Sequence, residues 1–299
     1  MDCIKKIEYF TLSDGQNLYV EQYWSGNTSN HTILLIHGGP GESCIGFSCV
    51  APMLSEHFRV ITLDQRGVLR SGNEPDNRKL TIHQILLDFE EIRAEYGIQK
   101  WWILGHSFGG YIAMRYALAF PQSLRGVFYE NPCFCPENSL RLILSRYARY
   151  FYTHGQGMEA ACAEQLIKCG DIIAQFDGTL SFPENVRKRL FHSEAITADC
   201  MALTDMSLIT EEAKIRSVHH LQIIKRDSTL TKRFIDDLIQ LPFASLLLRG
   251  EEDPMLPEED VAVFLKNSQN RVTVIPGAGH SIHSDYPKTF VRLVHDFVG

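Results

Sequence analysis

A serine with a glycine two residues away on each side stands at a change of pattern in this 299-residue chain. Gly105-His106-Ser107-Phe108-Gly109 follows an apolar run typical of a buried strand and precedes apolar residues at helical spacing. In that context G-x-S-x-G places a serine hydroxyl on a sharp turn, ready to attack an acyl carbon, and the helix N-terminus favours developing negative charge. We therefore predict that Ser107 is a nucleophile. The alternative is a serine that merely caps an ordinary strand–helix turn.

A serine hydroxyl is a weak nucleophile and needs a base, for which histidine is the usual side chain. His280 lies in IPGAGHS, just past a predicted strand, and is the predicted base. His283 is its competitor, because it lies one helical step away. His106 is expected to point away from the Ser107 side chain. His219 and His220 are expected at the surface.

The base in turn needs an acid to orient it. LLLRGEEDPMLP ends a predicted strand, and Asp253 follows its glycine by three residues. Asp253 is the predicted acid, and Glu130, at the end of another strand, is its rival. The resulting chain order of Ser107, Asp253 and His280 is typical of one hydrolase arrangement.

Acyl chemistry also needs donors for the oxyanion. The backbone N–H of Phe108, just after the nucleophile, is the first predicted donor. The second is the N–H of Gly39, in His37-Gly38-Gly39-Pro40-Gly41, where glycines let the backbone turn its amides toward a site. A plain Gly-Pro turn is the alternative.

The elements that must position these residues alternate along the chain. IEYFTLS and NLYVEQYW flank Asp14-Gly15 and predict an antiparallel hairpin. Apolar runs that start near His31, Phe58 and Trp101 are typical of strands buried on both faces, and LRGVFYEN is a further predicted strand. A helical stripe in TIHQILLDFEEIRAEYG ends at Gly97. This alternation predicts an α/β fold with a mostly parallel, twisted sheet flanked by helices.

The alternation stops between residues 134 and 241. Helical stripes fill this segment, such as Leu140, Ile143, Leu144, Tyr147 and Phe151. Strands resume with FASLLLRGEED and RVTVIPGAGH, and a last helix is predicted from about Pro287 to Val298. We therefore predict a core domain of residues 1–133 and 242–299, with a helical cap of residues 134–241 inserted between core strands.

Composition argues against several classes of protein, such as nucleic-acid-binding and membrane-spanning proteins. A net charge of -7 and a pI near 5.9 argue against an extended nucleic-acid footprint. We find no run of the ~20 apolar residues that a membrane helix needs, and MDCIKKIEYF lacks a signal core. The eight cysteines lack paired CxxC spacing, so we expect no zinc site and mostly buried free thiols in a cytoplasmic protein.

Several motifs together resemble those of the α/β-hydrolases and, more narrowly, of the proline iminopeptidase group. They are HGGPG from His37, DQRG from Asp64, GHSFGG from Gly105, GxxDxxxP from Gly250 and GAGHS from Gly277. The resemblance implies a catalytic triad of Ser107, Asp253 and His280, with no metal and no other cofactor. It also implies the removal of N-terminal residues from short peptides.

The chain departs from that group in three places. Leu69 stands where the group commonly has glycine after DQRG, Phe108 stands where many relatives have tryptophan, and the predicted cap contains no tryptophan. The group places cap glutamates against the substrate's amino group. Glu194, in LFHSEAITADC, is the candidate for that part, or else a solvated residue on a helix face. Asp64 and Arg66 are expected to hold neighbouring loops together.

An aminopeptidase or amidase is thus the first interpretation, and its partner is a small molecule or a short peptide. A carboxylesterase or lactonase acting on a small metabolite is the second, and a non-catalytic ligand receptor is the third. A serine at the turn disfavours epoxide hydrolases and haloalkane dehalogenases, which need a carboxylate there. The oligomeric state stays open.

Overall fold

One sheet organises the molecule. The computed structural model describes residues 3–26, 31–72, 80–191 and 206–299. Eight strands lie in the order β1-β2-β4-β3-β5-β6-β7-β8. Strands β1 (Ile4–Thr11) and β2 (Asn17–Trp24) form an antiparallel hairpin, β2 is antiparallel to β4, and the remaining neighbours are parallel. The predicted hairpin and the mostly parallel sheet are confirmed.

The parallel strands place several loops at one edge of the sheet. Their bounds are β3 (Thr32–Ile36), β4 (Arg59–Leu63), β5 (Trp101–His106), β6 (Leu124–Glu130), β7 (Ser245–Gly250) and β8 (Arg271–Ile275). Because β5, β6, β7 and β8 are consecutive neighbours, the loops after their carboxyl ends meet. Those loops carry Ser107, Asp253 and His280.

Helices cover both faces of the sheet. Helices α2 (Ile82–Glu95), α3 (Phe108–Ala119) and α10 (Glu258–Phe264) share a core with one face. Helices α1 (Ala51–Leu54), α11 (Ile282–Asp285) and α12 (Pro287–Val298) cover the other, and short 3-10 helices η1 (Cys44–Phe47) and η3 (Pro121–Ser123) lie in connecting loops. Neighbours along β5 alternate between these cores, because successive strand side chains point to opposite faces.

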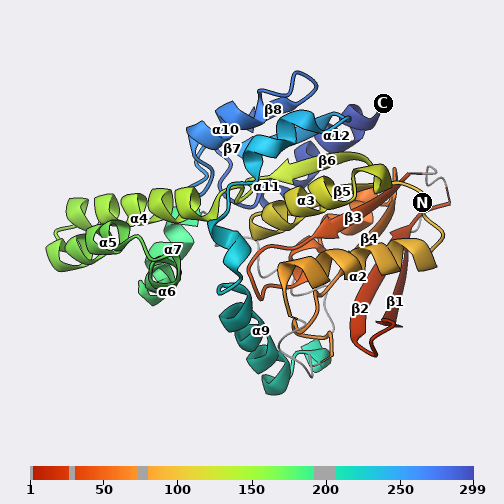
Figure 1. The fold of residues 1–299 in the computed structure, drawn as a ribbon, viewed down its shortest axis with the longest axis horizontal. Coiled ribbons are helices and arrows are strands. Elements are labelled where there is room, and N and C mark those ends of the chain that lie inside the picture. Colours follow the sequence, from red (N-terminus) through yellow and green to blue (C-terminus); the bar gives the residue numbers. More distant parts are fainter. Residues whose placement is uncertain (1–2, 27–30, 73–79, 192–205) are drawn as a thin grey trace.

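The described chain between β6 and β7 is helical. It forms α4 (Pro136–Thr153), α5 (Gly157–Cys169), α6 (Ile172–Ser181), α7 (Glu184–Phe191), η4 (Met206–Leu208), α9 (Glu211–Ile224), η5 (Ser228–Thr231) and η6 (Ile235–Gln240). Figure 1 shows α4 to α7 gathered beyond one end of the sheet, where they share a small core of their own. The end of the segment, from Ile224 to Leu238, packs on the main core instead. The cap boundaries at residues 134 and 241 stay a prediction.

The structure tests two expectations that came from composition, on membrane helices and on cysteine burial. Within the described ranges, we find no helix that combines the length and the apolarity needed to cross a bilayer. The described cysteines are free, and Cys44, Cys133 and Cys135 are buried. Three others, Cys3, Cys162 and Cys169, are exposed, so the expectation of mostly buried thiols was too broad.

Candidate active site

Ser107 occupies a strained turn between β5 and α3. Its backbone has φ 56° and ψ -123°, outside the regions that residues other than glycine usually adopt. Gly109 allows this geometry, because a Cβ there would lie 2.2 Å from the carbonyl oxygen of Ile36. Gly105 is equally constrained, since its Cβ would lie 2.3 Å from the carbonyl oxygen of Gly109. The glycines in the motif are therefore needed for the close packing of strand and helix.

His280 and Asp253 meet at the edge of the sheet. Asp253 follows β7, His280 follows β8, and Nδ1 of the imidazole lies 2.6 Å from Oδ1 of the carboxylate. The other carboxylate oxygen accepts the backbone N–H groups of Met255 at 3.1 Å and Leu256 at 2.7 Å. Both members of the pair are buried. Burial opposes the charged imidazole, but the hydrogen bond and charge of Asp253 prevail and raise the pKa of His280 above its ordinary value.

Ser107 and His280 line one cavity. In this structure the Ser107 hydroxyl donates a hydrogen bond to Sδ of Met255 at 3.5 Å, and not to the His280 ring. Met255 belongs to the loop that also carries Asp253. The three sequence-predicted residues are thus gathered at one edge, with the hydroxyl turned toward a neighbouring thioether.

The loop after β3 lies against Ser107. A Cβ on Gly38 would be 3.0 Å from Cβ of Ser107, and Gly39 has φ +113° with the N atoms of Gly41 and Glu42 at 2.7 Å from its Cβ position. No residue with a side chain fits at Gly39 without moving this backbone. Gly39 and Phe108 both line the cavity. Because Phe108 is the first residue of α3, its N–H has no acceptor within the helix.

Glu42 was missed by the sequence analysis. Its Oε2 lies 3.1 Å from the point where a Gly38 Cβ would stand, and Ser107 Cβ lies 3.0 Å from the same point. A carboxylate therefore stands a few ångströms from Ser107 and lines the same cavity. Its position directly after HGGPG is the signal that could have found it. The sequence-predicted Glu194 lies outside the described residues.

The cavity extends from Ser107 into the α4–α7 group and has a volume of about 400 Å³. Its far walls are apolar, with Leu140 and Ile143 from α4 facing Phe176 and Leu180 from α6. His280 is joined to this group, because its backbone N–H donates to the carbonyl of the last residue of α7 at 3.2 Å. The cavity is thus closed by the segment that follows β6.

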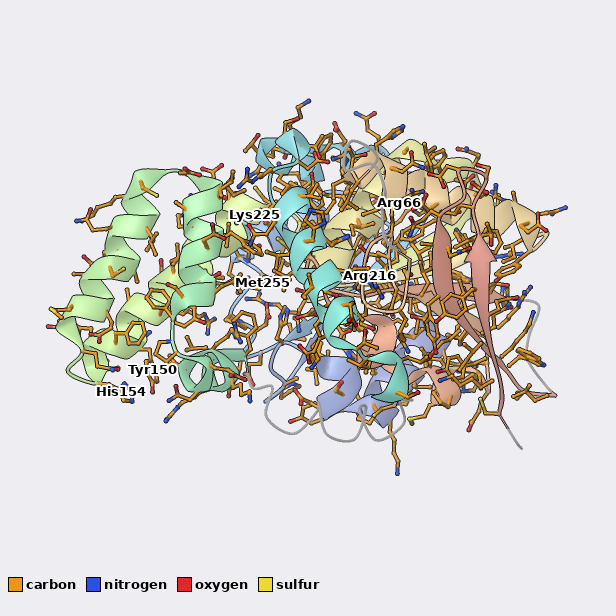
Figure 2. All side chains as sticks on the ribbon, turned by 90° about the horizontal axis from the view of Figure 1, so that it is seen from below. Arg66, Tyr150, His154, Arg216, Lys225 and Met255 are labelled. Carbon is orange, nitrogen blue, oxygen red and sulfur yellow. The ribbon has the colours of Figure 1, made fainter. Side chains whose placement is uncertain are left out.

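Charge is unevenly distributed along this cavity. Besides Glu42, the side chains of Lys225 and Arg187 line it. Lys225 donates to Asp177 on α6 at 2.6 and 2.8 Å, and Figure 2 shows Lys225 and Met255 on the side of α9 that faces the α4–α7 group. Arg187, on α7, has no carboxylate within 4.0 Å among the residues that the structure describes. The carboxylate of Glu42 lies beside Ser107, and the guanidinium of Arg187 belongs to the α4–α7 group.

The rival histidine and the rival acid pair with each other. Nδ1 of His283 lies 2.9 and 2.8 Å from the two oxygens of Glu130. The His106 ring lies beside them, with its Nδ1 3.3 Å from Glu130, and His106 is also among the residues that line the Ser107 cavity. Ligand atoms of these three residues all lie within 4.8 Å of one another, which makes them a possible metal cluster among the described residues. The Glu130 oxygens already accept hydrogen bonds, so we interpret the cluster as a hydrogen-bonded network.

The DQRG loop is held by buried ion pairs, in keeping with the structural role expected for it. Asp64 accepts Nε of Arg70 at 2.7 Å. Arg66 donates to Asp88 at 2.6 Å and to Asp14 at 2.8 Å. Neither Asp64 nor Arg66 is among the residues lining the cavity.

Helix α9 docks on this loop. Ser217 Oγ accepts the N–H of Leu69 at 3.0 Å, and Arg216 donates to the Leu69 carbonyl at 2.6 Å. His220 donates from Nδ1 to the Arg66 carbonyl at 2.8 Å and is fully buried, so the surface position expected for it was wrong. In Figure 2, Arg216 and Arg66 lie on the core side of α9. Leu69 has φ +33°, which explains why glycine suits this position.

Residues 31–287 match the family model described as alpha/beta hydrolase fold, and the chain belongs to that family. Within it, the chain is similar to proline iminopeptidases, as the motifs predicted. The enzyme from Xylella fastidiosa is 31% identical over 152 residues, which cover 46% of each chain. The enzyme from Saccharolobus solfataricus is 37% identical over 118 residues, which cover 39% of this chain and 38% of the relative. The chain therefore spans less than half the length of these curated relatives.

The fold extends further than the sequence similarity. The crystal structure of a proline iminopeptidase-related protein from Thermus thermophilus superimposes with a TM-score of 0.71. The match covers 98% of this chain and 96% of that chain at 21% sequence identity. At that identity the match shows a shared fold.

Proposed function

We propose that the protein is a serine hydrolase that cleaves a small acyl substrate through an acyl-enzyme, as an aminopeptidase or amidase. Ser107 is the proposed nucleophile, His280 the base and Asp253 the acid that orients it. The observation that carries this proposal is the 2.6 Å hydrogen bond between His280 and Asp253, at the rim of the cavity that holds the strained Ser107. Family membership supports a hydrolase.

The proposed first step is acylation. Rotation about the Cα–Cβ bond of Ser107 turns its hydroxyl from Met255 toward Nε2 of His280, a change compatible with the looser contacts common in unliganded sites. Oγ attacks the substrate carbonyl while Nε2 takes the proton, and the N–H groups of Gly39 and Phe108 donate to the oxyanion. His280 then protonates the leaving nitrogen or oxygen, whose bond to the carbonyl carbon breaks.

The second step is hydrolysis of the resulting Ser107 ester. Water gives a proton to Nε2 of His280 and attacks the ester carbonyl, and the same two amides hold the oxyanion. Collapse of this intermediate returns the proton to Ser107 and releases the acid. Asp253 keeps the proton on Nδ1 throughout and stabilises the imidazolium, which matches the raised pKa of His280.

Charge in the cavity supports a substrate with a free amino group. In an α-aminoacyl group, one carbon separates the amino nitrogen from the carbonyl carbon. A carboxylate a few ångströms from Ser107 can therefore accept the ammonium while the carbonyl meets Oγ, and Glu42 has that position. Arg187 complements a carboxylate at the other end of a short peptide. A cavity of about 400 Å³ suits such substrates and not folded proteins.

A carboxylesterase or lactonase is the second candidate. The apolar walls formed by Leu140, Ile143 and Phe176 suit an uncharged acyl chain. The same nucleophile, base and oxyanion donors would serve an ester.

Two measurements test the proposal. A fluorophosphonate probe is expected to label the wild-type protein and not Ser107→Ala; an unlabelled wild-type protein would contradict a serine hydrolase. A prolyl arylamide is then compared with a short-chain aryl ester of an uncharged acid. Turnover of the arylamide supports the aminopeptidase, whereas brisk ester cleavage without arylamide turnover supports the second candidate.

A further inference from the structure

Two consecutive residues at the end of β6 contact the segments that carry Ser107, Asp253 and His280. The Asn131 side chain donates to the carbonyls of Gly279 at 3.0 Å and His280 at 2.7 Å. Its Oδ1 accepts the N–H of Gly250, the last residue of β7, at 2.9 Å, three residues before Asp253. Asn131 is fully buried and has φ +40°, so the chain turns sharply to make these contacts.

Glu130 makes the matching contacts to the nucleophile and to the helix after the base. Its carbonyl accepts the N–H of Ser107 at 3.0 Å. Its carboxylate accepts the backbone N–H of His283 at 2.8 Å as well as the His283 ring nitrogen. Glu130 is fully buried, so bulk water screens this carboxylate very little.

One imidazole separates Glu130 from the base. The ring of His106 lies 4.8 Å, centre to centre, from the ring of His280 and 5.0 Å from the ring of His283. Phe191 contacts His280 edge-on with ring centres 5.1 Å apart. A negative charge on Glu130 therefore acts on His280 across a dry, packed layer, where electrostatic interactions are stronger than in water.

Burial opposes ionisation of Glu130, but His283 and His106 hold the pKa of this carboxyl well below its usual range. Burial lowers the pKa of His106, although Glu130 acts in the other direction. Among the described residues, the charged or titratable groups that act on or contact His280 are Asp253, Glu42, Glu130 and His106, and His283 contacts the His106 ring in turn.

We propose that Glu130 is a positioning residue for the base, a second buried carboxylate that stabilises the protonated form of His280 and keeps its loop aligned with the nucleophile. Glu130 acts through His106 and His283 and does not touch the reacting atoms. This role rests on the proposed serine hydrolase function, because it matters only if His280 accepts a proton from Ser107.

The test is the pH dependence of fluorophosphonate labelling, which needs no knowledge of the natural substrate. The acid limb of this profile, where labelling falls as the pH decreases, reports the protonation of the proposed base His280. In Glu130→Gln, which keeps the size of the side chain, the limb is expected to shift to lower pH by about half a unit or more and the plateau rate to fall about tenfold. Glu130→Asp keeps the charge but moves it away from the histidines, because its side chain is one carbon shorter. Its acid limb is expected to lie between those of the wild type and of Glu130→Gln.

Glu251→Gln is the matched control. Glu251 accepts the N–H of Gly277 at 2.9 Å in the loop before the base, but it is exposed, so water screens its charge. The acid limb of labelling in Glu251→Gln is expected to match that of the wild type. Addition of EDTA to wild-type protein is expected to leave labelling unchanged; loss of labelling would overturn the proposal, because the His106–Glu130–His283 cluster would then serve as a metal site.

The outcomes separate this role from the proposed function. Near-ultraviolet circular dichroism checks that Glu130→Gln is folded. If the folded variant has the acid limb of the wild type, the role of Glu130 is overturned, even if the plateau rate of labelling is lower. If Glu130→Gln does not fold, a wild-type limb in Glu130→Asp does the same. Failure of the hydrolase proposal appears differently, as wild-type protein that is not labelled at any pH.

Discussion

Oδ1 of Asp253 lies 2.6 Å from Nδ1 of His280, and both side chains are buried. Asp253→Asn keeps the size of the acid but loses its charge and favours the wrong tautomer of the imidazole. We expect kcat for a cleaved aryl ester or arylamide to fall by roughly 10³–10⁴-fold. Glu258→Gln, an exposed carboxylate on α10, is the control. Near wild-type activity in Asp253→Asn would instead favour Glu130 as the acid.

The contact between Ser107 and Met255 is expected to be dispensable. Met255→Leu removes the sulfur acceptor at little change in volume, so the hydroxyl is free to turn toward His280. The fluorophosphonate labelling rate of this variant is expected to equal the wild-type rate or to exceed it by up to about threefold. A tenfold loss would show that Met255 assists the nucleophile.

Glu42→Gln tests recognition of the amino group. Removal of the charge is expected to raise KM for a prolyl arylamide by about 10-fold or more, since hydrogen bonds to charged groups contribute about 1.5–3 kcal/mol. KM for the N-acetylated arylamide, or for an ester without an amine, is expected to change less than twofold. Equal effects on the free and the blocked substrates would reject this role.

Arg187→Gln tests the far end of the cavity. KM is expected to rise about 5-fold or more for a dipeptide with a free carboxyl terminus and to stay unchanged for the corresponding dipeptide amide. Arg189→Gln is the matched control, because Arg189 lies on the same helix and is exposed. If both arginine variants behave alike, the effect is one of general charge and not of a binding site.

His220 makes the protein sensitive to acid. Burial lowers its pKa to about 3, below the ordinary value of 6.5. Above pH 6.5 both the folded and the unfolded chain hold a neutral ring, and this contribution to stability is complete. Between pH 6.5 and about 3 only the unfolded chain takes up the proton, so the free energy of unfolding falls by about 1.4 kcal/mol per pH unit.

His220→Asn is expected to flatten this dependence. The asparagine amide can still donate to the Arg66 carbonyl, but it does not titrate. Denaturant unfolding measured from pH 7 to pH 4 is expected to show a shallower loss than in the wild type, whereas the exposed neighbour variant His219→Gln keeps the wild-type slope. Identical slopes in all three proteins would show that His220 titrates normally.

The sequence predicted the sheet, the sharp turn and its glycines because these depend on local constraints. A strand, a serine and glycines at fixed spacing specify the turn at Ser107 with little help from the rest of the chain. The convergence of the loops that carry Asp253 and His280 followed from the parallel order of their strands.

Other features were missed because they depend on which distant segments meet. Nothing near Asn131 indicates that its amide joins the loops after β7 and β8. His220 could have been found, since it continues a buried stripe of Ala213, Ser217 and Ile224 at helical spacing. Glu42 needed the loop after β3 to be placed against Ser107.

Asn131 lies only five residues before α4, the first helix beyond the sheet. The residue that joins the segments of Asp253 and His280 thus precedes the helical segment that closes the cavity. A change of length or sequence in that helical segment therefore need not disturb the alignment of the residues proposed to carry out bond cleavage. We infer that the substrate preference of such a scaffold is free to change while the arrangement of these residues is kept.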